Sequence, residues 1–351
     1  MEPQGLLKHF LKYPPQGFSS GVTAHGVPWF DATLDLLTTL DERLRRRVRS
    51  WWIHRLLGPL LRWRTLFIGS TVTEYLPLPG GLTADQLVAE LHTRRHARRL
   101  LIVKDIPADD ALIGTQALAR AQHCCDALQR AGFVLLQGQA LAWVAIDFSS
   151  QAHYLERLSS ARRKNIRRKL RDAAGLDIRC LPTGCAWLSD ERVRRTLYDL
   201  YLKVYRQSET QFDLLSPLFF DAVFQDTGSA GHLFVYRDGD HIVGWNLCYE
   251  YADALVDKYI GLDYPRSREL NLYVVSWMNN LEFARARGLR HYIAGWTDPQ
   301  IKSELGAQFA FTRHAVYTRN PLLRWLLRRM AGVFEGDRRW FETHAHDATR
   351  S

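Results

Sequence analysis

The order of hydrophobic and polar residues in the first half of the chain predicts a mixture of helices and strands. Residues 1–30 mix glycine, proline and serine as loops do, and an amphipathic helical pattern begins near Ala32. Between residues 41 and 69, arginine alternates with tryptophan, leucine and isoleucine at helical spacing. This segment predicts a buried pair of helices with a basic rim, and a segment lying on a membrane surface is the alternative. Further along, the pattern predicts strands at 100–105, 133–136 and 141–148 and a helix at 115–131.

The second half of the chain predicts a sheet combined with helices. A turn at residues 238–240 joins two strands into a hairpin, and a long helix separates the last two strands. This succession of strands, crossover helix and returning strand predicts an α/β layer. The expected strands are 177–181, 232–236, 241–251, 254–262 and 290–295, and the expected helices are 190–206, 216–224 and 270–287.

The densest positive charge of the chain lies in a predicted helix at residues 159–171. Seven of the ten residues from Arg162 to Arg171 are Lys or Arg, and Ile166 and Leu170 stand four apart to anchor one face. No carboxylate follows until Asp172, although a solvated helix usually intersperses acidic residues. We interpret the helix as a site for phosphate or another polyanion, with a basic surface helix matched by acidic patches elsewhere as the alternative.

Composition limits the kind of protein to a folded chain of about two domains. It has 351 residues, of which 46% are hydrophobic and 24% charged, so wholesale disorder is excluded. Lys and Arg number 47 against 37 Asp and Glu, a net charge of +10. The excess favours anionic partners such as phosphates, nucleic acid or acidic lipid, although a GC-rich genome also raises the arginine content.

Cysteine usage and hydropathy restrict the location of the protein. The five cysteines are scattered without CxxC pairs, which argues against a disulfide framework and a zinc site, so no metal is expected. No stretch approaches the roughly 18 to 20 apolar residues of a membrane span. We expect a cytoplasmic protein, with a peripheral membrane contact as an addition. Residues 320–341 predict a basic amphipathic helix that packs on the first domain or touches a membrane, and residues 343–351 predict disorder.

Several short motifs occur in a fixed order in the second half. A basic helix with a glycine and a strand spans residues 162–178, and the hairpin LFVYRDGDHIVGWNLCYE follows. The loop LDYPRSRELN enters a helix that finishes ARARGLRHYIAGW, and the tail TDPQIKSELGAQF places Lys302 four residues before Gly306. In this order the motifs resemble the GNAT superfamily of N-acyltransferases, and within it the FemAB-like and BioF2-like branch.

The resemblance implies a fold and a division into domains. It implies an α/β (α+β) protein with two GNAT-like domains, in which mixed, mostly antiparallel sheets are flanked by helices. The expected ranges are a loop-rich segment at 1–30, a degenerate first half at 31–155, an acyltransferase half at 156–318, and an amphipathic helix and tail at 319–351.

The resemblance also implies where an activated donor binds. In GNAT enzymes a glycine-rich turn brings phosphate to a helix N-terminus, because glycine has no Cβ and its N–H group points at the anion. The corresponding loop here, residues 263–271, has no glycine. This leaves room for a carrier-protein or aminoacyl-tRNA donor beside acyl-CoA. The candidate donor-binding residues are Arg162, Arg163, Lys164, Arg167, Arg266, Arg268 and Asn271.

Amide formation needs an uncharged amine, a group that stabilises the oxyanion, and a route for a proton. The resemblance carries over Lys302 as the cation. Asp257 and Glu250 are candidates for the base or for an anchor of the acceptor amine; Asp257 and Lys258, as neighbours on one strand, point to opposite faces. The candidate substrate-binding residues are Trp245, Asn246, Tyr264 and Trp296, although aromatic side chains on such strands often belong to the core.

These observations lead to one principal functional hypothesis and two alternatives. The principal hypothesis is an N-acyltransferase that moves an acyl group from acyl-CoA or acyl-carrier protein to an amine by direct attack, without a permanently bound cofactor. The first alternative is an aminoacyl-tRNA-dependent transferase of the FemAB kind. The second is a non-catalytic protein that binds polyanions or a membrane surface.

Overall fold

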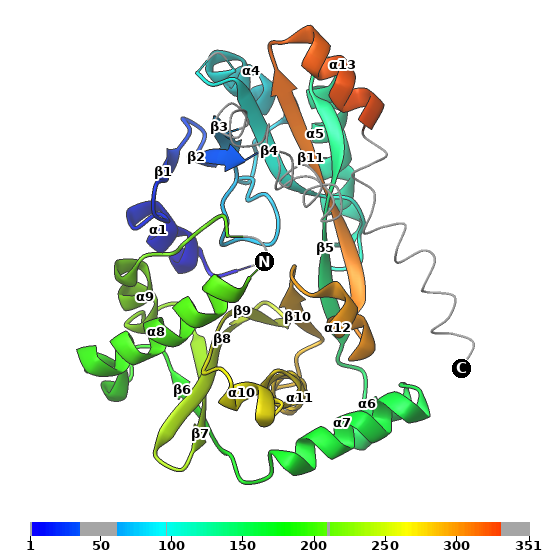
Figure 1. Ribbon diagram of the computed structural model, residues 1–351. Helices are drawn as coiled ribbons and strands as arrows, with labels where there is room; N and C mark the ends of the chain where they lie inside the picture. The colour runs from blue at the N-terminus through cyan, green and yellow to red at the C-terminus, as the bar shows by residue number, and fades with distance from the viewer. Residues whose placement is uncertain (1, 36–61, 96, 209–210, 331–351) are drawn as a thin grey trace, which may run out of the picture. The chain divides into compact units, whose positions relative to one another are not determined.

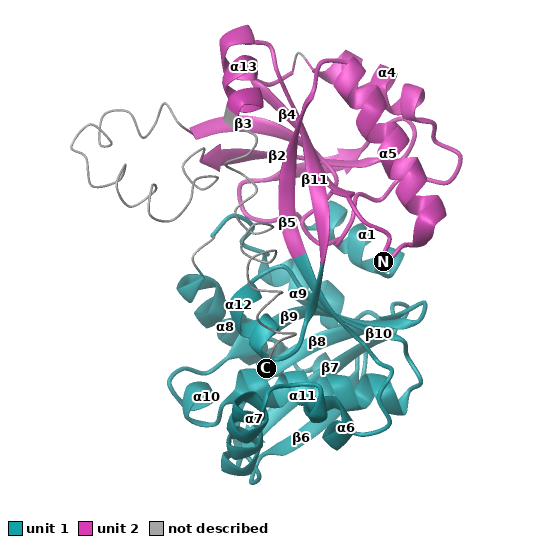
Figure 2. Cartoon of the chain, turned by 90° about the vertical axis from the view of Figure 1, so that its right-hand side faces the viewer, with its two compact units in different colours: residues 1–13, 141–309 teal, residues 14–140, 310–351 magenta. Residues whose placement is uncertain are grey.

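The computed structural model describes residues 2–35, 62–95, 97–208 and 211–330 (Figure 1). The part of the expected helical segment at 41–61 and the tail at 331–351 lie outside the described residues. The chain divides into two compact units (Figure 2). Unit 1 comprises residues 1–13 and 141–309, and unit 2 comprises residues 14–140 and 310–351. The chain passes from one unit to the other after Tyr13 and again inside two strands, β5 (Val134–Ala145) and β11 (Gln308–Thr318).

Unit 1 is built on a mixed sheet with the strand order β5-β10-β9-β8-β7-β6. Every neighbouring pair is antiparallel except β9 and β10, which are parallel. The helix α11 (Leu272–Ala286) connects these two parallel strands. The other strands are β6 (Asp177–Pro182), β7 (Gly231–Asp238), β8 (His241–Tyr251), β9 (Ala254–Leu262) and β10 (His291–Gly295).

Helices cover both faces of this sheet. The seven consecutive residues from Val243 to Tyr249 in β8 are all buried, as expected for a central strand covered on both sides. One face packs against α8 (Glu191–Gln207), where the Trp245 indole donates a hydrogen bond to the Leu197 carbonyl at 2.8 Å. The other face packs against α11, which in turn contacts α6 (Gln151–Glu156) and α7 (Ser160–Asp172).

Local sequence explains where the helices of unit 1 begin. The Ser216 side chain accepts a hydrogen bond from the Phe219 N–H, and Pro217 occupies the first position of α9 (Pro217–Phe224).

The N-terminal helix α1 (Gln4–Lys12) buries Leu6 and Phe10, spaced four apart, and contacts α9. In α7, Ile166 is buried as the sequence predicts, while most of the basic side chains stay exposed or half-buried.

Unit 2 has the strand order β1-β2-β3-β4-β11-β5. Its strands β3 and β4 are parallel and are connected by α4 (Ala84–Arg94), which begins with a capping box between Thr83 and Gln86. The helix α5 (Gly114–Arg130) follows β4, and α13 (Pro321–Met330) follows β11. The remaining strands are β1 (Ser19–Val22), β2 (Pro28–Asp35), β3 (Arg62–Ile68) and β4 (Leu100–Pro107).

Both units therefore repeat one topology. A run of antiparallel strands, three in unit 2 (β1 to β3) and four in unit 1 (β6 to β9), leads into a parallel crossover through a helix. An antiparallel strand pairs with the other side of the crossover strand, β11 in unit 2 and β5 in unit 1. The expected α/β class with mixed, mostly antiparallel sheets flanked by helices is confirmed. The units do not coincide with the ranges expected at 31–155 and 156–318, because β5 and β11 each belong to both units and α1 packs within unit 1.

Three expectations for the first third of the chain were wrong. Residues 1–30 contain α1 and β1 rather than only loops, and the helix expected near Ala32 is the strand β2. Residues 62–68 form the strand β3 rather than a helix. A short Arg-Trp-Arg sequence fits the period of a strand as well as that of a helix, so a segment this short does not distinguish a strand from a helix. In addition, the two strands expected at 133–136 and 141–148 are the single strand β5.

The short helix α12 (Pro299–Glu304) ends in a Schellman motif. The Ala307 N–H bonds to the Lys302 carbonyl at 3.0 Å, and the Gly306 N–H bonds to the Ser303 carbonyl at 3.1 Å. Gly306 has φ +95°, and an added Cβ would lie 2.8 Å from both the Tyr154 hydroxyl and Leu158. The Lys-x-x-x-Gly spacing is thus the spacing between the last turn of α12 and the glycine that ends it.

We predict that Gly306→Ala lowers the free energy of unfolding by about 3 kcal/mol, because it combines a left-handed backbone with a collision against α6. Gly288→Ala is the matched control: Gly288 follows α11 with φ +67° but has no atom within 4 Å of an added Cβ. We expect this control to lose only about 1 kcal/mol in urea unfolding. Equal losses in the two variants would show that the contact with Tyr154 and Leu158 is unimportant.

Candidate active site

The parallel pairing between β9 and β10 stops inside both strands. It joins residues 254–256 of β9 to residues 291–293 of β10, although the strands continue to Leu262 and Gly295. We call the position where it stops, with Asp257 on β9 and Ala294 and Gly295 on β10, the β9–β10 end. An added Cβ on Gly295, whose φ is +79°, would lie 3.9 Å from the Asp257 carbonyl oxygen. The backbones remain close here without continuing the ladder, so polar side chains can take over.

Lys302 reaches the β9–β10 end from α12. Its side chain is buried, with 3% of the residue exposed. The ammonium donates to the Ala294 carbonyl at 2.6 Å and to the Gly295 carbonyl at 3.1 Å. Because the Schellman motif fixes the last turn of α12, the helix end and the two carbonyls together hold the cation in one place. The structure thus brings Lys302 to the end of a strand, beside the second predicted residue, Asp257.

Asp257 lies at the centre of a buried polar network. Its carboxylate accepts hydrogen bonds from the Asn246 amide at 3.2 Å, from the Asn280 amide at 2.9 Å and from the Tyr292 hydroxyl at 2.9 Å. The network extends to β7, because the Tyr236 hydroxyl donates to the Asn246 Oδ1 at 2.7 Å. Four elements therefore hold this carboxylate: β7, β8, α11 and β10.

Burial dominates the acidity of Asp257. Desolvation raises the pKa of the carboxyl, and this outweighs the lowering by its hydrogen bonds and by the positive charge of Lys302. The half-buried carboxylate thus combines a partly desolvated charge with three fixed donors and a nearby cation. Such a perturbed group beside a buried lysine is typical of a functional site, although structural networks have the same features.

Glu250, the other carboxylate candidate, lies in a different cluster. It contacts the His232 imidazole and forms an ion pair with Arg287, each at 2.8 Å. Arg287 follows Asn280 by seven residues along α11, which corresponds to about 10 Å of helix. The structure therefore does not bring Glu250 to Asp257 and Lys302. Lys258 faces away from Asp257 as predicted, with its ammonium 3.9 Å from the Glu2 carboxylate.

The candidate donor residues after β9 are already engaged by neighbouring side chains. Arg266 forms ion pairs with Asp238 at 2.6 Å and Glu269 at 2.8 Å. Arg268 stacks on the Tyr264 ring at 4.8 Å and donates to Gln207. Residues 266–269 form the short helix α10 (Arg266–Glu269), and Asn271 follows with φ +51° as the N-cap of α11. These contacts replace a glycine turn with a cross-linked helical turn.

The basic residues of α7 keep more of their surface exposed. Lys164, Arg167 and Arg171 are exposed, while Arg162 and Arg163 are half-buried. The Arg163 guanidinium donates to the Glu156 and Leu158 carbonyls. Arg168 forms the single ion pair described for this helix, with Asp172 at 3.3 Å. Unit 1 therefore has an exposed basic face along α7, and binding of a polyanion to it stays a prediction.

The predicted substrate-binding residues are divided between the two faces of the sheet. Asn246 belongs to the Asp257 network, whereas Trp245 is fully buried on the opposite face against α8. Alternation along β8 explains this separation. Tyr264 is half-buried and forms a cis peptide bond with Pro265, and Trp296 is half-buried directly after β10. Trp245 thus has the core position that aromatic residues on such strands often take.

Three members of the network were not predicted from the sequence: Tyr236, Asn280 and Tyr292. Asn280 is fully buried in the middle of α11, and the Tyr292 hydroxyl accepts its second hydrogen bond at 3.1 Å. A signal was available, because asparagine inside the apolar helix LYVVSWMNNLEF is unusual and a buried amide requires partners. Its partner could not be named from the sequence, since β9 and β10 meet α11 only in the fold.

Within the described residues, no group of three or more His, Cys, Asp or Glu side chains is arranged to hold a metal ion. The helices in the same parts of the chain are too short or too polar for any of them to cross a membrane.

We predict that Asp257 makes stability depend on pH in a defined direction. Because its pKa is higher in the folded chain than in the unfolded one, the folded state binds more protons above about pH 4, and stability falls as the pH rises through this window. Asp257→Asn removes that dependence. Urea unfolding from pH 4.5 upward should show the wild type losing stability relative to the variant.

Asp240→Asn is the control, because this carboxylate is fully exposed in the β7–β8 turn. This variant keeps Asp257, so its stability should fall with rising pH as that of the wild type does. A wild type that gains stability relative to Asp257→Asn as the pH rises would contradict the argument.

Comparisons with known proteins agree with this architecture. A solved structure of the C-terminal domain of a putative lysylphosphatidylglycerol synthetase from Agrobacterium fabrum is 13% identical, covers 94% of this chain and 90% of its own, and has a TM-score of 0.53. L-PGS from Bacillus licheniformis is 12% identical over 94% and 98%, with a TM-score of 0.51. FemX is 11% identical over 93% and 98%, also with a TM-score of 0.51. At these identities the likeness concerns the fold.

No curated protein sequence matches the chain. A sequence model of the FemAB_like family, described as peptidoglycan biosynthesis/recognition, matches residues 82–324. This match covers both strands that pass between the units, the β9–β10 end and Lys302. The chain therefore belongs to the FemAB_like family, a family of transferase type.

Proposed function

We propose that the protein transfers an acyl or aminoacyl group from an activated donor to an amine, and that Lys302 is its catalytic cation. The observation that supports this most directly is the buried ammonium fixed at 2.6 and 3.1 Å from two carbonyls where the β9–β10 pairing stops. A buried lysine is rare unless its charge is compensated. Here the carbonyl groups of Ala294 and Gly295 and the nearby Asp257 carboxylate compensate the charge. The cation is therefore already oriented before a substrate binds.

The chemistry that we propose is a direct attack. The uncharged amine forms a C–N bond with the donor carbonyl carbon, and negative charge develops on the carbonyl oxygen, where a fixed cation stabilises it. The bond to the leaving group then breaks, and the proton lost by the amine neutralises the leaving group or passes to water. Asp257 acts in this proposal as a positioning residue, because its carboxylate already accepts three hydrogen bonds.

We favour aminoacyl-tRNA over an acyl-thioester as the donor. The turn before α11 lacks the glycine that a CoA pyrophosphate would approach, and Arg266 is paired there with two carboxylates. By contrast, α7 presents an exposed basic face that suits a long anionic molecule. An acyl-CoA or carrier-protein donor is the second candidate. For the acceptor we propose an amine of a peptidoglycan precursor, which is consistent with the family's description.

Lys302→Met should lower the transfer rate by about 100-fold or more, because it removes a preorganised charge while keeping the length of the side chain. Lys258→Met is the matched control, since Lys258 is a second buried lysine of unit 1 on the opposite face of β9. The assays are amine-dependent release of labelled amino acid from a bulk aminoacyl-tRNA pool and release of free thiol from acyl-CoA. Circular dichroism checks that each variant is folded.

A full rate in Lys302→Met, or equal losses in both variants, would refute the catalytic role of Lys302. A wild type that consumes neither donor in the presence of a peptidoglycan precursor peptide would contradict the proposed reaction.

The triple variant Lys164→Gln, Arg167→Gln and Arg171→Gln should weaken binding of the tRNA pool. If each side chain contacts one phosphate, the slope of log K against log salt should become shallower by about 2 to 3. Arg192→Gln with Arg195→Gln, two exposed arginines on α8, controls for the loss of charge. Unchanged tRNA binding in the triple variant, together with salt-tolerant binding of acyl-CoA, would favour the thioester donor instead.

A further inference from the structure

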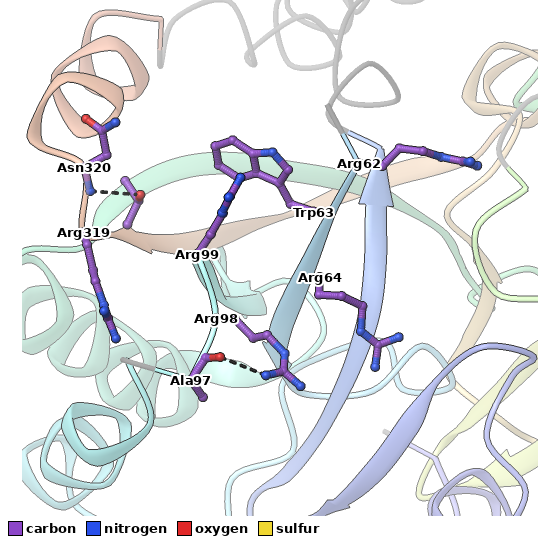
Figure 3. A pocket seen from close by; sticks show the side chains of 9 residues that line it. Arg62, Trp63, Arg64, Ala97, Arg98, Arg99, Arg319 and Asn320 are labelled. Atoms are coloured by element: carbon purple, nitrogen blue, oxygen red, sulfur yellow. Dashed lines mark hydrogen bonds between the residues drawn. The ribbon is translucent and has the colours of Figure 1, made fainter. Parts of the chain in front are cut away.

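Unit 2 contains a pocket lined by arginine side chains, with a cavity volume of about 730 Å³. Figure 3 shows that these side chains come from three places: the start of β3, the start of β4 and the end of β11. Trp63 adds an aromatic wall, and among the described residues that line the pocket there is no carboxylate. The arginines are Arg62, Arg64, Arg98, Arg99 and Arg319.

Two acidic residues stand near these arginines. Asp31 on β2 is buried and pairs with the Arg64 guanidinium at 2.6 Å and with Arg98. Asp35 stands opposite Arg62 in the register of β2 and β3. The part of the chain that the structure describes thus places five guanidinium groups around one pocket. A group with several negative oxygens is the ligand that this arrangement suits, because guanidinium groups bind phosphate oxygens in pairs.

The helix α13 starts at the edge of the same pocket. Asn320 lines the pocket, and its side chain accepts hydrogen bonds from the Leu322 and Leu323 N–H groups at 2.9 and 3.2 Å. The first turn of α13 is therefore continuous with the pocket wall.

Three large apolar residues of α13 are turned outward, while Leu323 and Leu327 are half-buried. Leu322, Trp325 and Leu326 are 70%, 55% and 42% exposed, and their spacing places them on one face of the helix. On the inner side, the Arg324 guanidinium donates to the Thr318 carbonyl at 2.6 Å and stacks on the Tyr317 ring at 5.0 Å. A helix on the surface of a soluble protein normally turns its leucine side chains toward the core and its arginine side chains toward water. Exposed apolar residues grouped in this way indicate a contact surface.

We propose that this part of unit 2 docks on a bilayer that contains anionic phospholipid. The arginine pocket takes the lipid phosphates, and the outward face of α13 enters the interfacial region with its leucine and tryptophan side chains. Arg328 and Arg329, exposed at the end of the same helix, add charge that an acidic bilayer attracts. A bilayer accounts for both halves of the surface, whereas a nucleic acid would bind the arginines but gain nothing from exposed leucines.

This inference goes beyond the proposed function, because it concerns unit 2 and involves neither Lys302 nor a donor. It gives the protein a surface that would hold it at a membrane, where it would meet its substrates. The two halves of the surface also make different energetic contributions: salt weakens the arginine contribution and leaves the apolar contribution of α13 largely unaffected.

The test is flotation of the full chain with vesicles of phosphatidylcholine alone and with about 30 mol% phosphatidylglycerol. The wild type should float only with the anionic vesicles. The double variant Arg99→Gln with Arg319→Gln should bind about 30-fold more weakly, at about fivefold per arginine. Leu322→Ser with Leu326→Ser should lower binding at every salt concentration.

Arg192→Gln with Arg195→Gln provides the matched charge control in unit 1 and should float as the wild type does. Thermal unfolding of each variant excludes loss of the fold as the cause. Equal binding to both kinds of vesicle, or an equal loss in the α8 control, would overturn the proposal. So would weakened tRNA binding in Arg99→Gln with Arg319→Gln if vesicle binding stayed intact, because the pocket would then be a nucleic-acid site.

Discussion

The contact of one buried ammonium with two strand carbonyls holds the candidate site together. Lys302 satisfies the Ala294 and Gly295 carbonyls where β9 can no longer do so, and its charge acts on Asp257 across the β9–β10 end. Without that cation, two carbonyl oxygens would lose a donor and the Asp257 carboxylate would lose a compensating charge, each with a cost in free energy. The geometry of α12, its terminal glycine and the Asn246–Asn280–Tyr292 network all serve to keep these charges at fixed positions.

A lysine that donates to a carbonyl beside the end of a parallel strand pair occurs a second time in the chain. In unit 2 the parallel pairing of β3 and β4 stops after Ile68 and Val103, and the next residue of β4 is Lys104. The Lys104 ammonium donates to the Ser70 carbonyl at 2.7 Å and pairs with Asp105, whose φ is +58°. A lysine and an aspartate thus accompany the end of the parallel pair in each unit. The two lysines come from different places, one from the strand itself and one from a helix beyond it, so the recurrence reflects the topology rather than a repeated sequence.

The sequence predicted the parts of this architecture that depend on local pattern. The hairpin of β7 and β8 follows from its Asp-Gly-Asp turn, α9 from its Ser-Pro start, and α7 from its two apolar anchors among basic residues. Lys302 and Asp257 were identified as candidates, but their proximity was not, because one lies on α12 and the other on β9. The position of Glu250 relative to Asp257 could not be predicted from the sequence. Glu250 shares a strand face with Asn246, yet its contacts with His232 and Arg287 are set by long-range packing that no local pattern contains. Where a short segment such as Arg62 to Arg64 fits both a helical and a strand period, only its pairing with other strands decides whether it forms a helix or a strand.

The division of the chain has a consequence for how the protein is made. Helix α1 belongs to unit 1, and its His9 contacts Asp226, which lies 217 positions later in the sequence. The last strand of unit 2, β11, is synthesised after nearly all of unit 1. Neither unit can therefore be completed by a contiguous stretch as it leaves the ribosome, and the first helix must wait with its apolar face uncovered until residues near 220 appear. Contacts of such sequence separation slow folding and prolong the exposure of unfinished surfaces. Two interleaved units thus fold late and together rather than one after the other.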